Sequence, residues 1–72
     1  MNQENNSFGA SIERGLIRQA TDSGFIVESY DRKGLTTPPI QAIWQKTYNA
    51  GDRVYFFLFD DGNGKIIALM DD

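Results

Sequence analysis

The sequence predicts an all-β domain, a single small five-stranded antiparallel barrel. Turn-forming residues recur at short intervals along the 72-residue chain, and the segments between them are rich in β-branched and aromatic side chains. Hydrophobic residues make up 40% of the chain and charged residues 24%, which is the composition of a globular protein. A chain of this length buries only about 60% of its unfolded surface, so we expect association to contribute to its stability.

The turn signals divide the chain into a polar tail over residues 1–8, expected to be disordered, and a domain over residues 9–72. Within the domain, strands are expected at about residues 10–20, 25–31, 35–43, 53–60 and 65–71. Gly15 interrupts the first segment where the alternation of apolar and polar residues slips, which predicts a bulge or a bend. A long, bent first strand followed by four shorter ones suits a barrel of the oligonucleotide-binding-like (OB-like) or SH3-like kind.

Two segments also allow helix. Residues 11–20 place Ile12, Leu16 and Ala20 at helical spacing, although a glycine in the middle of a helix costs about 1 kcal/mol relative to alanine. Residues 40–46 could form one short helical turn between the third and fourth strands. We predict a strand for the first segment and leave the second open.

The last two strands form the clearest hairpin, because residues 60–65 supply glycine and asparagine for a tight turn. A loop of two or four residues pairs positions whose numbers sum to 125, such as Phe59 with Ile66. One face then consists of Val54, Phe56, Leu58, Ile67 and Leu69. The other consists of Tyr55, Phe57, Phe59, Ile66, Ala68 and Met70. A loop of odd length changes the partners, but both faces stay apolar.

A small barrel has one interior, so one of these two faces lies outside it. The segment 35–48 could fold across that face, or the face could be exposed and form an interface. The sequence leaves both arrangements open. The candidate interface residues are Trp44, Tyr55, Phe57, Phe59, Ile66 and Met70.

The residues that usually perform catalysis or bind metal are scarce. The chain has no Cys and no His, which excludes disulfides, the usual zinc sites and Cys or His catalysis. The turn at residues 60–64 matches a calcium loop poorly, because Phe59 stands where an acidic ligand is needed. Glu13 and Glu28 are expected to be outward charges on strands, and residues 31–34 a solvated turn. We therefore expect no enzyme activity, no metal and no cofactor.

The charge is acidic, with a net value of −3, whereas a nucleic-acid-binding surface is usually basic. Nucleic acid is thus an unlikely partner, although Tyr55, Phe57 and Phe59 could stack bases if Lys46, Arg53 and Lys65 contacted phosphates. The longest apolar run, residues 54–59, is too short to cross a bilayer, and the N-terminus has no signal-peptide pattern. We expect a cytoplasmic location and no membrane partner.

One resemblance follows from the order of these segments. A bent first strand is followed by Gly24-Phe25-Ile26-Val27, a proline-containing segment, residues 50–57 (AGDRVYFF), a glycine turn and residues 65–69 (KIIAL). This order resembles small OB-like β-barrel proteins of bacteriophages and prophages, of the tail or baseplate type. The likeness covers roughly residues 10–70, and its most specific piece is Gly51-Asp52-Arg53-Val54 before an apolar strand.

The resemblance implies a structural role without catalysis. It implies self-association, or docking on other phage structural proteins in a tail, baseplate or head–tail assembly, with the virion as the location. Two alternatives stay open: a single-stranded nucleic-acid-binding OB domain, and an adaptor module that captures a peptide along a sheet edge.

Overall fold

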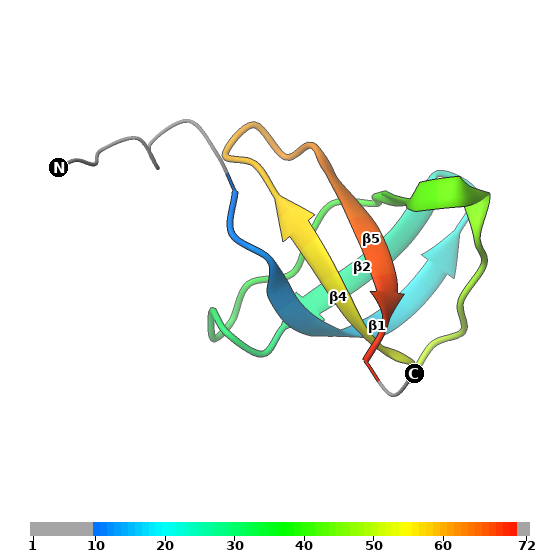
Figure 1. The fold of residues 1–72 in the computed structure, drawn as a ribbon, viewed down its shortest axis with the longest axis horizontal. Helices are drawn as coiled ribbons and strands as arrows, with labels where there is room; N and C mark the ends of the chain where they lie inside the picture. Colours follow the sequence, from blue (N-terminus) through cyan, green and yellow to red (C-terminus); the bar gives the residue numbers. More distant parts are fainter. Residues whose placement is uncertain (1–9, 71–72) are drawn as a thin grey trace, which may run out of the picture.

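The computed structural model describes residues 10–70. It contains the strands β1 (Glu13–Thr21), β2 (Gly24–Ser29), β3 (Gln41–Ala42), β4 (Arg53–Leu58) and β5 (Gly64–Leu69), and the short turn η2 (Ile43–Gln45). The strands form one five-stranded sheet in the order β2-β1-β4-β5-β3 (Figure 1). The all-β prediction is confirmed, and so is one short helical turn between β3 and β4. The helix considered for residues 11–20 is wrong, while the tail at residues 1–8 lies outside the described range.

The sheet is mixed and is not closed by continuous strand pairing. The prediction of five strands is therefore confirmed, whereas the prediction of a purely antiparallel barrel is not. β3 runs parallel to β5, and all other ladders are antiparallel. β2 and β3 stand at the two ends of the strand order. Between them, the chain before β3 makes isolated bridges to β2, from Ile40 to Phe25 and from Thr36 to Glu28. The strand expected over residues 35–43 is reduced to two residues because Pro38 and Pro39 have no N–H to donate.

The core lies between the two hairpins of the sheet. In Figure 1 the β4–β5 hairpin crosses over the β1–β2 hairpin. The side chains enclosed there come from all five strands and from the chain before β3 and after η2: Ile17, Val27, Ile40, Ala42, Tyr48, Val54, Phe56 and Ile66. The segment 35–48 therefore completes the core at the side of the sheet through Ile40, Ala42 and Tyr48.

Gly15 and Leu16 are the positions at which β1 is paired on both sides, and Gly15 is the more closely packed of the two. It faces Ser29 of β2 on one side and Val54 of β4 on the other. A Cβ atom there would stand 2.6 Å from Val27 Cγ1 and 2.8 Å from both the Glu28 carbonyl oxygen and Phe56 Cε1. The expected bulge lies elsewhere, between Ile17 and Gln19, where the register shifts. Gly15 is needed for this close approach and not for a bulge.

The start of β1 is tied to the end of β2 through a buried carboxylate. Glu13 is 6% exposed, so the expectation that it points outward is wrong. Its oxygens accept hydrogen bonds from Arg32 Nε at 3.0 Å, Arg32 Nη2 at 2.6 Å and the Ser29 hydroxyl at 2.8 Å. This pairing raises the pKa of the Arg32 guanidinium above its ordinary value. Glu28 is half-buried and lies 3.5 Å from Arg18 Nε.

A second pair crosses the same corner. Asp31 accepts hydrogen bonds from the backbone N–H of Arg14 at 2.8 Å and from its Nη2 at 2.6 Å. These bonds favour the ionised carboxylate and hold the pKa of Asp31 below its ordinary value of 3.8. The turn after β2 is exposed, as expected, and is also fastened to β1 by Asp31 and Arg32.

Gly15→Ala is expected to lower the free energy of unfolding by about 1–3 kcal/mol, because its methyl group collides with two side chains and a backbone oxygen. Urea denaturation measures the loss. Gln19→Ala, on the exposed side of the same strand, is the control and should change stability by less than about 0.5 kcal/mol. A Gly15→Ala protein as stable as the control would contradict the close packing.

The variant Asp31→Asn tests the ion pair between Asp31 and Arg14 through the pH dependence of stability. Because the folded-state pKa of Asp31 is lowered, its contribution is present above the ordinary value of 3.8 and is lost as the pH falls through the folded-state pKa. Thermal unfolding between pH 2 and 7 should show a smaller acid-induced loss of stability in Asp31→Asn than in the wild type. Equal slopes for the two proteins below pH 4 would show that the pair has no effect on folding.

Candidate functional site

The turn between β4 and β5 sets the register of the strand residues next to it, as far as Phe56 and Ile66; beyond them the register shifts between Phe56 and Tyr55. Five residues connect the strands, and the ends are held by hydrogen bonds from Phe59 N to the Asn63 oxygen at 2.7 Å and from Gly62 N to the Phe59 oxygen at 3.0 Å. Phe56 therefore faces Ile66, and Phe57 faces Lys65. The pairs expected from a loop of two or four residues, such as Phe59 with Ile66, are wrong.

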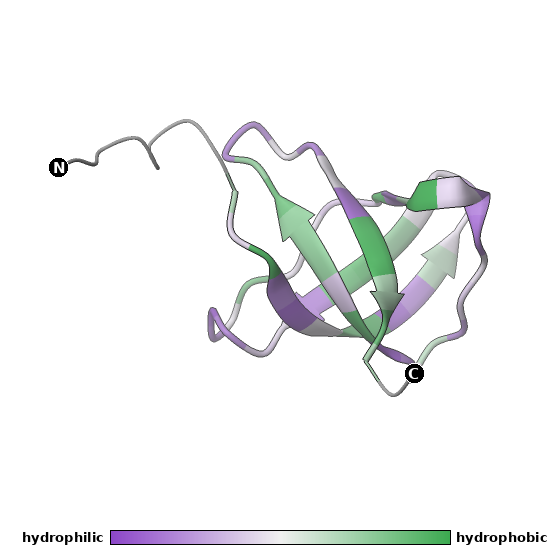
Figure 2. Cartoon of the chain, in the orientation of Figure 1, coloured by the Kyte–Doolittle hydropathy of each residue, from purple (hydrophilic) through white to green (hydrophobic). Residues whose placement is uncertain are grey.

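The odd loop moves Ile66 from the candidate interface into the core. Ile66 is fully buried beside Phe56, so its assignment to an interface is corrected. Tyr55, Phe57 and Phe59 alternate with core residues along the end of β4 and face away from the core, with exposed fractions of 36% for Tyr55 and 39% for Phe59. Figure 2 shows that β4 and β5 are hydrophobic along most of their length. The outer face is thus apolar and solvent-accessible.

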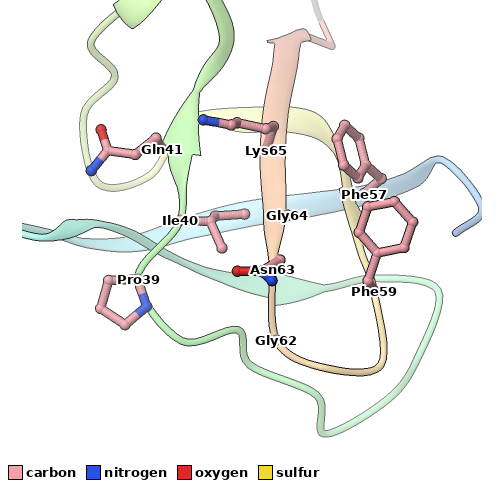
Figure 3. Close-up of a pocket in the computed structure, with 9 residues that line it drawn as sticks. All are labelled: Pro39, Ile40, Gln41, Phe57, Phe59, Gly62, Asn63, Gly64 and Lys65. Atoms are coloured by element: carbon pink, nitrogen blue, oxygen red, sulfur yellow. The ribbon is translucent and has the colours of Figure 1, made fainter.

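Two of these aromatic residues form one wall of a shallow groove of about 430 Å³, shown in Figure 3. The rings of Phe57 and Phe59 meet edge to face with their centres 5.5 Å apart. The opposite wall is the chain that enters β3, and the floor is the turn into β5. Its lining residues are Pro39, Ile40, Gln41, Phe57, Phe59, Gly62, Asn63, Gly64 and Lys65.

The floor of the groove is mostly backbone. A Cβ atom on Gly64 would collide with the carbonyl oxygen of Phe57, so only glycine fits there. Asn63 is held by Asp61, which accepts from its backbone N–H at 2.9 Å and from its Nδ2 at 3.0 Å. The remaining charge in the groove is Lys65, which takes part in none of the salt bridges among residues 10–70. The groove therefore offers two aromatic rings, a flat floor and one ammonium group.

Trp44 does not line this groove; it lies in η2 and is 86% exposed. Its backbone has φ 58° and ψ 17°, and Gln45 has φ 53°. With the hydrogen bond from Lys46 N to the Ile43 oxygen at 3.3 Å, this resembles a type I′ turn, in which glycine or asparagine is usual. A non-glycine residue in this conformation costs roughly 1–2 kcal/mol. The fold holds a large apolar side chain in water on a strained turn.

The predicted site residues are therefore only partly brought together. Phe57 and Phe59 are in contact, and Tyr55 shares their face but lies opposite Ala68. Met70 is half-buried beyond the end of β5, where its N–H donates to the Arg53 oxygen at 2.9 Å. It is absent from the groove lining.

Of the residues that line the groove, the predicted site contained only Phe57 and Phe59; it missed Pro39, Ile40, Gln41, Gly62, Asn63, Gly64 and Lys65. Pro39 belongs to the segment 35–48, which was expected either to cover the outer face or to leave that face open. Pro39 instead forms part of a wall beside the outer face. Lys65 was considered only as a phosphate contact. The available signal was the length of the turn at residues 59–63, which decides that Lys65 stands next to Phe57.

A second hollow of about 370 Å³ lies where the chain enters β1, lined by Ala10, Ser11, Ile12, Glu13, Asp31, Arg32, Leu58 and Asp60. Glu13, Asp31 and Arg32 are already engaged in the ion pairs described above. Across residues 10–70, no three His, Cys, Asp or Glu side chains are grouped so as to hold a metal ion. No helix in the same part of the chain has the length and apolar character needed to cross a membrane.

Comparison with known proteins does not assign this site. The chain has no significant match among protein-family models, curated proteins or solved structures. The resemblance to phage barrels therefore stays a prediction, and function has to be argued from the outer face and Trp44.

The variants Phe56→Ala and Phe59→Ala compare a core position with a surface position on the same hairpin. Phe56 is fully buried, so its truncation is expected to cost about 3–5 kcal/mol, close to the whole stability of a domain this small. Phe59 is 39% exposed and leaves no enclosed cavity, so a loss of about 1–2 kcal/mol is expected. Guanidinium denaturation measures both. Equal losses would place Phe59 in the core.

Proposed function

We propose that this protein is a non-enzymatic structural module that acts by self-association through the outer face of its β4–β5 hairpin. The observation that carries the proposal is the contact between the exposed Phe59 and the half-buried Phe57 in a groove on that face. A domain of this size has little core, and leaving large aromatic side chains in water is unfavourable unless another surface covers them. Trp44, at 86% exposed, adds a second such side chain.

The proposed architecture is an OB-like, partly open five-stranded barrel. Its support is that β1 pairs with both β2 and β4, and that residues 36 and 40 bridge β2 just before β3 pairs with β5. The proposed setting is a phage or prophage tail, baseplate or head–tail assembly, which rests on the resemblance in the order of segments. In such an assembly the module supplies binding surface and no chemistry.

A role in binding single-stranded nucleic acid is the weaker alternative. Stacking of bases on Phe57 and Phe59 needs cations along the backbone path. Lys65 is the one cationic residue among those that line the groove, and the acidic residues Asp60 and Asp61 follow directly after Phe59. Arg14, Arg18 and Arg32 are each paired with a carboxylate. This distribution of charge favours a protein surface as the partner.

Light scattering over protein concentrations from about 10 µM to 1 mM tests self-association, in the range expected for a small interface. The mass should rise with concentration in the wild type. The double variant Phe57→Ser with Phe59→Ser should give a folded monomer, because neither ring belongs to the buried core. A wild type that stays monomeric throughout, or a double variant that still associates, would contradict the proposal.

A further inference from the structure

The outer groove and Trp44 are complementary in shape. Trp44 is a protruding, 86% exposed indole, and the groove of about 430 Å³ is lined by Phe57, Phe59 and Pro39. Pockets that hold small ligands begin at about 300 Å³, so the groove has room for an indole ring. Its flat floor at Gly62–Gly64 allows a planar ring to lie close to the backbone (Figure 3).

The charges beside the two features are also complementary. Lys46, two residues after Trp44, is exposed, whereas the exposed Asp61 lies in the turn between Phe59 and Gly62 and binds Asn63, all three of which line the groove. Lys65 lines the groove and takes part in no salt bridge among residues 10–70, so its ammonium can lie over the face of an inserted indole. A surface that presents Trp44 and Lys46 thus matches a surface that presents Phe59, Asp61 and Lys65.

Trp44 lies on a turn whose backbone conformation is uncommon for residues other than glycine. Two consecutive non-glycine residues, Trp44 and Gln45, have φ values of 58° and 53°. Such conformations persist only where the surrounding structure fixes them, and they are concentrated at binding sites. A rigid turn that presents an aromatic side chain loses little conformational entropy on binding. Trp44 is therefore preorganised as an anchor.

We infer that Trp44 of one copy inserts into the groove of a second copy, and that the contact is reciprocal in a two-fold dimer. Gln41 forms part of the groove wall, and η2 begins two residues later, so the anchor and the groove lie in neighbouring parts of the surface. A two-fold axis then lets both copies make the contact at once. This inference rests on the proposed self-association and names the residues that perform it.

Trp44 is the only tryptophan in the chain, so its fluorescence reports directly on the contact. Sedimentation velocity and Trp44 emission are measured on the same samples from about 1 µM to 1 mM. We expect dimer formation with a dissociation constant between about 10 µM and 1 mM, as suits an interface at the small end of the range. The emission should shift to shorter wavelength with the same midpoint as the mass.

Two variants each remove one partner of the proposed contact, either the Trp44 anchor or the groove ring Phe59. Trp44→Ser leaves the groove intact, and Phe59→Ser leaves the anchor intact. Each is expected to weaken dimerisation by at least about 30-fold, as for a residue that dominates an interface. Tyr30→Ser is the matched control, because Tyr30 is an aromatic residue that is 50% exposed outside the groove. Dimerisation of the control should be unchanged.

Mixing the two variants restores one of the two contacts and makes the decisive measurement. Only the Phe59→Ser copy contains tryptophan, so adding the Trp44→Ser copy should shift its emission to shorter wavelength. Adding more Phe59→Ser protein instead should give a smaller shift. Absence of a shift on mixing overturns the inference.

The outcomes separate the inference from the proposed function. A wild type that associates with unchanged Trp44 emission overturns the role of Trp44 and leaves self-association standing. A wild type that is monomeric at every concentration overturns both. Circular dichroism of each variant confirms that it is folded, which is expected because neither Trp44 nor Phe59 belongs to the core.

Discussion

The whole sheet depends on one strand that is paired along both of its edges. β1 contacts β2 over residues 15–21 and β4 over residues 13–16, and it is the strand that joins the two hairpins in the sheet order. The two ladders overlap at Gly15 and Leu16. The neighbouring strands approach so closely at Gly15 that no side chain fits. From this contact follow the crossing of the hairpins and the single enclosed core.

The same constraint explains why polar side chains are buried beside the core. Where β1 begins, its first residue must reach the turn that follows β2, and Glu13 does so by pairing with Arg32 and Ser29. A buried charge that lost its partner would be costly. Hydrogen-bond geometry thus fixes the start of β1 against the turn after β2, while packing of apolar side chains fixes the core. Because the chain has no cysteine, these non-covalent contacts hold the start of β1 to the turn after β2 without a disulfide.

A single core in so small a domain also determines what stays outside. One face of β4 fills the interior with Val54 and Phe56, and the opposite face leaves Phe57 and Phe59 at the surface. The chain before β3 closes the side of the core and so forms a groove with these rings instead of covering them. The exposed apolar surface is a consequence of the way the core is completed. This is the physical basis of the proposed self-association.

The sequence by itself determined the strands and the apolar character of both hairpin faces, because β-branched residues, aromatic residues and glycine turns act over a few residues. It also determined the absence of His and Cys chemistry. Only the tertiary structure decided that Ile66 is buried, that Glu13 points inward and that Trp44 is exposed. These depend on the five-residue turn at 59–63 and on packing between strands far apart in the chain. Local patterns carry no information on such distant contacts, so the groove could not be predicted from them.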